Sequence, residues 1–466
     1  MAEHILFLTG HLARPRLEKV LASLSDAGFT SSIVDIGVKV AALMTEAIIA
    51  RRLPRPVTAA RVIVPGRCRA DLARLTAEFG VPFERGPDEL KDLPAYFGKG
   101  GRGLDLTRYD IRIFAEIVDA SALTVETILA RAHAMHAAGA DVIDLGCLPD
   151  TPFPHLEESV RELKAAGFQV SADSASTDEL RRGGKAGADF LLSLTETSLD
   201  VAADTGATPV LVPASHGDMA SLLRAAEAAD KRGIATLLDP VIDPIHFGFM
   251  ESLSRYAELR RILPTAEILM GTGNLTELTD ADSGGVTAML LGICSELAIR
   301  NVLVVQVSPH TRRTLQEHDA ARRIMFAARE DSSLPKDYGN ALLALHDKKP
   351  FPTTPAEIAE VAREVRDPNF RIETAEDGIH VYNRDGHHVA RDALSLFSKL
   401  GVDKDGAHAF YLGTELMKAE IAFRLGKRYA QDEPLDWGVA VDRSPEDTTR
   451  LRAAGHTLRA KVSKSE

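Results

Sequence analysis

The stretch AGADVIDLG, residues 138–146, shows the unit from which the middle of the chain is built. A helical pattern ends at a glycine and leads into a short apolar run that carries a carboxylate, Asp144, near its end. Apolar runs of this kind occur eight times between residues 112 and 328, and most gaps have room for an amphipathic helix. The predicted strands read RIFAEIV, DVIDLG, FQVSAD, FLLSL, TPVLVP, ATLLD, EILMG and NVLVVQV.

Eight consecutive β/α units predict an α/β protein with a central (β/α)8 barrel, or TIM barrel, at residues 106–330. Such a barrel typically takes about 250 residues. A doubly wound open sheet is the alternative, because it also alternates strands and helices. The units run on without an obvious reversal of order, and this favours a closed barrel.

A smaller unit flanks the predicted barrel on each side. Residues 1–105 alternate apolar runs and helical patterns, which predicts a doubly wound N-terminal α/β domain that ends in a glycine-rich linker. Residues 331–466 predict a C-terminal α+β domain. Two of its strands are expected around a turn at residues 376–378, and a long helix is expected over residues 407–429.

The composition is that of an ordinary globular protein, and it excludes some partners. A net charge of −12 and a single Trp argue against nucleic acid, which binds basic faces and aromatic platforms. No run reaches the roughly 18 apolar residues of a membrane-spanning helix, and the acidic start is unlike a signal peptide. Three widely spaced Cys residues fit a reducing compartment, so we expect a cytoplasmic protein without membrane or nucleic-acid partners.

Polar side chains fall where four of the predicted strands end. The second, third and sixth strands end in Asp144, Asp173 and Asp239, and the seventh leads to an amide, Asn274. Ligands bind at the carboxyl ends of the strands of a TIM barrel, so we expect these side chains to converge on one pocket. A carboxylate can accept hydrogen bonds from two adjacent donors, as on a pterin or guanine-like ring. Capping of the following helices is the alternative role for each Asp.

The predicted barrel resembles the pterin-binding family, which includes the dihydropteroate synthases and the corrinoid-linked and methionine-synthase methyltransferase domains. The resemblance implies that Asp173 and Asp239 contact a pterin and that Asp144 is the acid of the second strand. Asn274 matches the ring-contacting amide of the methyltransferases. The stretches that carry the resemblance are AGADVIDLG, VSADSAS, TLLDPVIDPIHFGF and MGTGNLTEL.

The chain departs from the synthases at several motifs. Their first loop, which helps to hold diphosphate and metal, is replaced by AEIVDAS, with Glu116 in place of an Asn. Leu192 or Ser193 replaces the amide of their fourth strand, and the GTGN segment lacks their lysine. The whole chain is more similar to dihydropteroate synthase-related proteins found with tetrahydromethanopterin genes. The segments of this closer likeness are GTGNLTELTDADSGG, VSPHTRR, HAFYLGTEL and LGKRYAQDEPLDWG.

Charged residues after the last two strands extend the candidate site. His310 and Arg312 follow the eighth strand, where TIM barrels often bind phosphate, and a diphosphate leaving group could bind there. An exposed start of the last helix is the alternative for this pair. Asp280 and Asp282 offer oxygen ligands for Mg²⁺ as a possible cofactor, or an N-cap for the next helix. We assign no catalytic residue and no metal site.

The resemblance implies a pterin-binding transferase, and three functions follow from it. The first is condensation of 6-hydroxymethyl-dihydropterin diphosphate with an arylamine, in the biosynthesis of a tetrahydromethanopterin-type cofactor. The second is methyl or one-carbon transfer with a reduced pterin as carrier. The third is a non-catalytic pterin-binding protein. The family resemblance also implies a homodimer, and the flanking domains offer surfaces for a protein partner.

Overall fold

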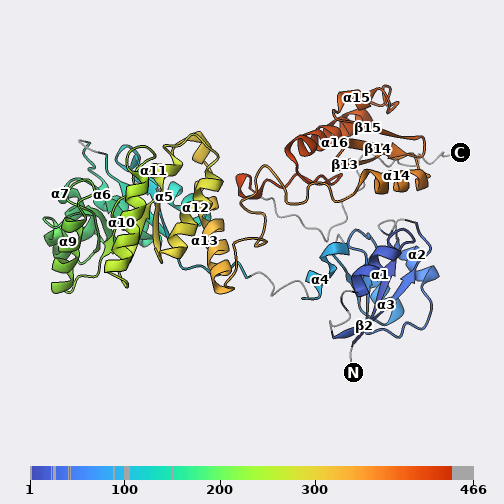
Figure 1. Ribbon diagram of the computed structural model, residues 1–466, viewed down its shortest axis with the longest axis horizontal. Helices are drawn as coiled ribbons and strands as arrows, with labels where there is room; N and C mark the ends of the chain where they lie inside the picture. Colours follow the sequence, from blue (N-terminus) through green and yellow to red (C-terminus); the bar gives the residue numbers. More distant parts are fainter. Residues whose placement is uncertain are drawn as a thin grey trace.

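The chain folds into three units, each built on its own sheet (Figure 1). The computed structural model describes residues 3–22, 24, 28–39, 41, 44–87, 90–98, 105–148 and 151–442. In Figure 1 the barrel lies on one side of the molecule and the two smaller units lie next to each other on the other side. The predicted fold class, an α/β barrel with a smaller unit before and after it, is confirmed.

The middle unit is a closed barrel of eight parallel strands. Its last strand pairs with its first, from Asn301 opposite Arg112 to Val304 opposite Ala115, and this pairing closes the sheet. The open-sheet alternative is therefore excluded. The strands are β5 (Arg112–Ile117), β6 (Val142–Gly146), β7 (Gln169–Asp173), β8 (Phe190–Leu194), β9 (Thr208–Leu211), β10 (Leu237–Leu238), β11 (Glu267–Gly271) and β12 (Asn301–Val304).

Helices surround the barrel and follow its strands. Their starts are set by local side chains, as where the hydroxyl of Ser176 accepts the N–H of Glu179. The barrel helices are α5 (Val125–Ala137), α6 (Leu156–Ala165), α7 (Thr177–Ala186), α8 (Leu199–Thr205), α9 (Met219–Lys231), α10 (Phe249–Ile262), α11 (Gly273–Thr276), α12 (Ser283–Glu296) and α13 (Thr314–Glu330), with 3-10 turns η3 (Ala120–Ala122) and η4 (Pro309–Thr311).

Alternate side chains along the strands form two separate cores. Outward-facing residues pack against the helices in one large apolar cluster. Inward-facing residues fill the barrel, where the rings of Phe114 and Phe190 meet edge to face with centroids 5.0 Å apart. Burial of one such ring stabilises the fold by roughly 2–3 kcal/mol. The inward-facing apolar residues are Phe114, Val142, Phe190, Leu192, Val210, Leu237, Leu269 and Leu303.

A buried arginine joins the last barrel helix to the first strands. Arg322 of α13 is 1% exposed and pairs with Asp141, the residue before β6, and with Asp319. Its guanidinium also donates to the carbonyl oxygens of Ile111 and Gly139 and lies 3.5 Å from the ring centroid of Tyr109. The charge is thus fully paired, as a buried charge must be.

The N-terminal unit is a parallel sheet with the strand order β2-β1-β3-β4. Ile5 and Phe7 of β1 pack into one apolar cluster, and Leu6 and Leu8 pack into another, as in a doubly wound sheet with two covered faces. Residues 90–96, which were predicted to be linker, form short helical turns. The elements are β1 (Glu3–Thr9), α1 (Arg14–Ala22), β2 (Phe29–Asp35), α2 (Glu46–Arg52), β3 (Arg61–Val64), α3 (Leu72–Phe79), β4 (Phe83–Arg85), η2 (Leu90–Asp92) and α4 (Leu93–Tyr96).

The C-terminal unit is an antiparallel sheet with the order β13-β14-β15, covered by the long helix α16. The predicted pair of strands and the helix are confirmed, while β15 was not predicted. Helix α16 ends earlier than expected, because Gly426 adopts the left-handed conformation of a C-cap. The elements are α14 (Pro355–Glu364), β13 (Arg371–Ala375), β14 (Gly378–Asn383), β15 (Gly386–Ala390), α15 (Leu394–Phe397), α16 (Gly406–Leu425) and η5 (Gly438–Ala440).

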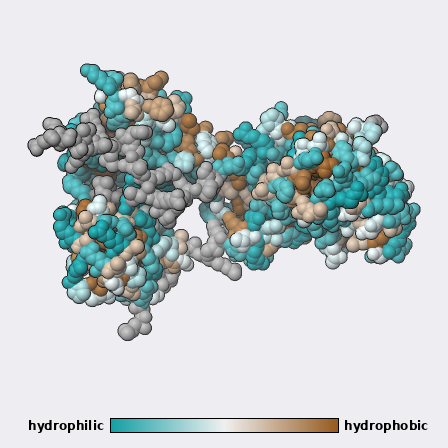
Figure 2. Space-filling view, turned by 180° about the vertical axis from the view of Figure 1, so that it is seen from behind, coloured by the Kyte–Doolittle hydropathy of each residue, from teal (hydrophilic) through white to brown (hydrophobic). Residues whose placement is uncertain are grey.

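The C-terminal unit contacts both of the other units. Glu364 of α14 forms an ion pair with Lys39 of the N-terminal unit. Near the end of the described chain, the carbonyl of Val439 and the carboxylate of Asp442 bind Arg313, at the start of α13. The face in Figure 2 is mostly hydrophilic, with scattered hydrophobic residues on each unit. Among the described residues, no helix is long and apolar enough to cross a membrane.

Candidate functional site

Four carboxyl groups lie at the carboxyl end of the barrel, beyond its apolar filling. On β5 and β6, Glu116 and Asp144 each follow an inward-facing apolar residue by two positions, so they also point inward. They stand opposite each other in the strand register. Asp173 ends β7, and Asp239 comes directly after β10. Three of the four were predicted from their positions at strand ends, and Glu116 joins them.

A cavity of about 340 Å³ opens at this end of the barrel. Glu116, Asp173, Asp239 and Asn274 line it, whereas Asp144 lies deeper and is fully buried. A cavity of this size matches the lower range of small-molecule sites. Its other lining residues are Leu192, Ser193, Val210, Val212, Val241, Ile242, Leu269, Gly271, Gly273, Glu277, Leu278, Leu303 and Val305.

Glu116 and Asp144 form the floor of the site. Asp144 accepts a hydrogen bond from the hydroxyl of Ser171 through Oδ1, while its Oδ2 is buried without a partner among the described residues. Burial and the charges of Asp173 and Glu116 raise the pKa of Asp144 well above its usual range. Burial and the charge of Asp173 likewise raise the pKa of Glu116 to about 7. The floor therefore holds protons near neutral pH and can donate hydrogen bonds as well as accept them.

Glu116 has room for its carboxyl group because residue 146 has no side chain. A Cβ atom at Gly146 would lie 2.6 Å from Oε1 of Glu116, which is closer than real Cβ atoms approach such atoms. Gly146 thus belongs to the site through the space that it leaves open.

An irregularity in β8 aims a hydroxyl group at Asp173. The register of β8 with β9 shifts between Leu191 and Leu194, and Ser193 adopts a positive φ of 65°. The hydroxyl of Ser193 donates a 2.6 Å hydrogen bond to Oδ1 of Asp173. Burial raises the pKa of Asp173, and this hydrogen bond opposes the rise. Bulges of this kind often redirect side chains next to functional sites.

Asp239 is held by partners on its own strand loop and on α10. Its Oδ1 accepts hydrogen bonds from the hydroxyl of Tyr256, at 2.6 Å, and from the N–H of Val241, at 2.8 Å. Burial raises the pKa of Asp239 to about 6, and the bond from Tyr256 opposes the rise. Val241 has a φ of 62°, a strained value for a β-branched residue, and such strain gathers at functional sites.

Asn274 lies on the part of the cavity wall next to Asp239, because it follows β11, the strand that pairs with β10. Its side-chain NH₂ donates a 2.7 Å hydrogen bond to the carbonyl of Ile242, in the loop after β10, which leaves its amide oxygen to accept from a ligand. A Cβ atom at the preceding residue, Gly273, would lie 2.9 Å from Val305 Cγ2, so this helical turn packs closely against the end of β12.

No Lys, Arg or His side chain is among the described residues that line the cavity. Nε2 of His310 donates a 3.0 Å hydrogen bond to the carbonyl oxygen of Thr276, and Arg312 is exposed on the adjoining loop. Neither residue lines the cavity, and their role at a phosphate stays a prediction. Asp282 occupies the N-cap position of α12, and Mg²⁺ binding there also stays a prediction.

The helix-capping alternative for the three aspartates is excluded. The N-cap residues of α6, α7 and α10 are His155, Ser176 and Gly248. From the sequence alone, Glu116 and Ser193 are recognised only as departures from a motif, and Glu277 is not among the predicted site residues. Glu116 could have been found from its spacing, since it lies two residues after the buried Phe114 on the same strand. Ser193 faces the site only because of the bulge in β8, and no sequence pattern predicts that bulge.

The middle of the chain is thus a (β/α)8 barrel with an acid-lined cavity at the carboxyl end of its strands, and comparisons with known proteins show what the chain is similar to. Residues 3–88 match a protein-family model described as a family of unknown function, DUF6513. The chain is 29% identical over 371 residues to the uncharacterized protein MJ0107 of Methanocaldococcus jannaschii. The aligned region covers 70% of this chain and 69% of that protein.

Solved dihydropteroate synthases are similar in structure to about half of the chain. The 7,8-dihydropteroate synthase of Vibrio fischeri is 16% identical, with 49% of this chain and 95% of that chain covered and a TM-score of 0.38. The Yersinia pestis enzyme with a pterine-sulfa conjugate is 19% identical, with 50% and 98% covered and a TM-score of 0.37. The barrel fold itself rests on the strand order of this chain.

Proposed function

We propose that the barrel cavity binds the ring of a pterin and that the protein is a transferase that acts on this pterin. The observation that carries the proposal is the acid cluster: Glu116, Asp173 and Asp239 line a cavity that contains no cationic side chain among the described residues. Such a lining favours an uncharged ring that is rich in hydrogen-bond donors.

The protonation of the cluster suits the mixed edge of a pterin. The ring presents an N–H and an amino group side by side, and one carboxylate can accept both hydrogen bonds. It also presents acceptors, which need a donor. With pKa values raised to about 7 for Glu116 and about 6 for Asp239, ionised and protonated carboxyl groups coexist near neutral pH. Asn274 adds an amide oxygen as a further acceptor.

The first reaction that we propose is a condensation that builds a tetrahydromethanopterin-type cofactor. The nitrogen of an arylamine would bond to the methylene carbon of 6-hydroxymethyl-dihydropterin diphosphate, the bond from that carbon to the diphosphate oxygen would break, and the amine would release a proton. Asp173, Asp239 and Asn274 would hold the ring. The diphosphate would lie outside the acid-lined cavity, toward His310 and Arg312, since its charge would be repelled inside.

A second candidate is one-carbon transfer with a reduced pterin as carrier. The absence of lysine and arginine from the described cavity lining favours it, because such a carrier brings no diphosphate that needs neutralisation. Transfer of a methyl group would then require a separate acceptor protein. A pterin-binding protein without catalytic activity would have the same cavity but would catalyse neither the condensation nor the one-carbon transfer.

Direct binding tests the shared part of these functions. We expect 7,8-dihydropterin or tetrahydromethanopterin to raise the melting temperature of the full chain, since a ligand of the native state stabilises it. Asp239→Asn should remove most of this rise, while the control Asp200→Asn, at an exposed position of α8, should not. The absence of a shift with either pterin would refute the proposal. Turnover of the pterin diphosphate with 4-aminobenzoate selects condensation, and methyl exchange with a corrinoid protein selects the second candidate.

A further inference from the structure

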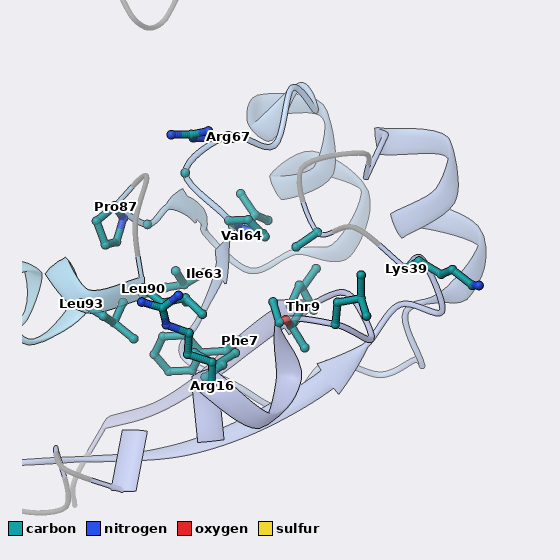
Figure 3. A pocket seen from close by; sticks show the side chains of 18 of the residues that line it. Phe7, Thr9, Arg16, Lys39, Ile63, Val64, Arg67, Pro87, Leu90 and Leu93 are labelled. Carbon is teal, nitrogen blue, oxygen red and sulfur yellow. The ribbon is translucent and has the colours of Figure 1, made fainter. Parts of the chain in front are cut away.

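A second cavity, also of about 340 Å³, lies in the N-terminal unit and is separate from the barrel (Figure 3). It opens where β1 and β3 end, between two neighbouring strands of the β2-β1-β3-β4 sheet. From β1 the chain crosses to β2 on one side and then returns to β3 on the other, so the direction of the crossover reverses here. In open α/β sheets, ligands bind in the crevice at this reversal point.

The inner part of the cavity is apolar. Phe7 and Ile63 come from the two strands, and Leu17 comes from α1. Leu90 and Leu93, from the segment after β4, close the side opposite the sheet. Phe7, Leu17, Ile63 and Leu93 are each buried, so this part of the cavity is held in shape by packing on both sides. An apolar or aromatic ring fits such a lining.

The rim of the cavity is cationic, in contrast to the acid-lined cavity of the barrel. Arg16, Lys39 and Arg67 are among its lining residues, and no described lining residue is acidic. Arg16 extends from the first turn of α1 toward Leu90 in Figure 3, whereas the ammonium group of Lys39 points outward and pairs with Glu364. The Arg16 guanidinium forms no hydrogen bond or ion pair among the described residues, and its acidic neighbour there is Glu357 of α14, whose pKa it helps to lower. Its N–H groups can therefore donate to an anion in the cavity.

The backbone around Arg16 also favours an anion. Helix α1 has nine residues and begins near the end of β1, where the helix dipole is positive. Pro15 has no N–H and the N–H of Leu17 donates to the carbonyl of Ala13, so the first turn offers the N–H groups of Arg14 and Arg16. The loop after β2 lies tightly against this end. A Cβ atom at Gly10 would lie 2.8 Å from both the nitrogen of Ala41 and the carbonyl oxygen of Val38. The tight contact shapes the cavity wall and keeps it close to the first turn of α1.

The C-terminal unit completes the cavity. Val361 of α14 is a lining residue, and the ion pair between Lys39 and Glu364 connects the same helix to the N-terminal unit. A molecule in the cavity would therefore contact both units at once.

From these observations we infer that the N-terminal unit binds a ring-bearing phosphomonoester of mononucleotide size. The ring would lie among Phe7, Ile63 and Leu90, and the phosphate would accept hydrogen bonds from Arg16 and the first turn of α1. This site is independent of the pterin site in the barrel.

Binding of defined probes to the full chain tests the inference. Flavin mononucleotide, adenosine monophosphate and guanosine monophosphate are compared with riboflavin, adenosine and guanosine by isothermal titration calorimetry. We expect at least one monophosphate to bind, and its phosphate-free partner to bind about tenfold more weakly or worse, because the charge-assisted hydrogen bonds are lost. Arg16→Ala should weaken binding to a similar degree. Arg14→Ala is the matched control, since Arg14 pairs with Glu18 on the same helix and does not line the cavity.

Two further variants test the roles of α14 and of the barrel. Val361→Glu places a negative charge at the cavity and should weaken binding of the monophosphate, while Ala356→Glu on the same helix should not. Asp239→Asn should leave this binding unchanged even where it removes pterin binding. The inference is overturned if none of the three monophosphates binds, if the nucleosides bind equally well, or if Arg16→Ala and Val361→Glu leave the affinity unchanged.

Discussion

The hydroxyl group of Tyr256 donates a 2.6 Å hydrogen bond to Oδ1 of Asp239 and so connects α10 with the acid cluster. Tyr256 is fully buried, and no water can replace its hydroxyl without a rearrangement of the helix. The bond favours the ionised form of Asp239 against the effect of burial, which raises the pKa of this group to about 6.

Loss of this hydroxyl should shift the titration of Asp239 to higher pH. In Tyr256→Phe, burial acts without the opposing bond, and we expect the pKa of Asp239 to rise by about 1–2 pH units. The ¹³C chemical shift of the Asp239 carboxyl group, followed against pH, measures this directly. Tyr338→Phe removes a hydroxyl that binds Asp331, outside the barrel, and serves as the control. An unchanged titration in Tyr256→Phe would contradict the assignment.

Glu116→Gln should stabilise the protein at alkaline pH. The pKa of Glu116 is raised in the folded state from 4.5 to about 7, so the protonated form is favoured by folding. The protonated Glu116 carboxyl group therefore makes its full contribution to the free energy of unfolding below about pH 4. This contribution is lost as the pH rises through about 7, where the group ionises in the folded state as well. Glutamine avoids this loss, and we expect a gain of about 2 kcal/mol in the free energy of unfolding at pH 8, after solvent screening of a half-buried group.

Urea denaturation at pH 5 and pH 8 measures this gain, which should be largest at pH 8 and small at pH 5. Glu251→Gln, at an exposed position of α10, is the control and should change stability little at either pH. A gain of equal size at both pH values would show that the pKa of Glu116 is not its source.

Two substitutions of Ser193 distinguish the effect of its hydroxyl group from the effect of its backbone conformation. Ser193→Ala and Ser193→Gly both remove the hydrogen bond to Asp173, and both should raise the pKa of that carboxyl group. Glycine accepts the positive φ of 65° without strain, whereas alanine does not. We therefore expect the glycine variant to be more stable than the alanine variant by about 1 kcal/mol in urea denaturation. Equal stability of the two would argue against strain at this position.

Among the arginines of α13, Arg322 should contribute most to the stability of the barrel, because its charge is buried and fully paired. Arg322→Ala removes the cation that pairs with Asp141 and the donor of two backbone carbonyl groups, which we expect to cost about 3–5 kcal/mol in the free energy of unfolding. Arg323→Ala, at the half-exposed neighbour that pairs with Asp319, should cost about 1 kcal/mol or less. Thermal and urea denaturation of both variants provide the comparison.

The barrel could be predicted because its strands show their inward and outward faces in local patterns. The acids at the ends of β7 and β10 could be predicted for the same reason, since a polar residue after an apolar run marks the carboxyl end of a buried strand. Asn274 required the family resemblance as well, because an amide after a glycine is also typical of a turn.

Other parts of the site depend on contacts that are distant in sequence. Nothing near Asp239 indicates that Tyr256 binds it, because that contact depends on how α10 packs against the barrel. The role of Ser193 depends on a bulge between two strands. The third strand of the C-terminal sheet, β15, was not predicted, since its GHHVA sequence carries two histidines and lies at a partly exposed edge.

The empty space at Gly146 links the possible changes at two positions. Oε1 of Glu116 occupies the place that any side chain at residue 146 would need. A substitution at Gly146 would displace this carboxyl group, and its Cβ atom would also lie 3.1 Å from Cα of Val118 and 3.2 Å from the carbonyl oxygen of Ile117, so a shorter residue at position 116 would relieve only part of the crowding. In divergence and in engineering alike, residues 116 and 146 therefore constrain each other, and covariation of the two positions among relatives is the mark that such a constraint would leave.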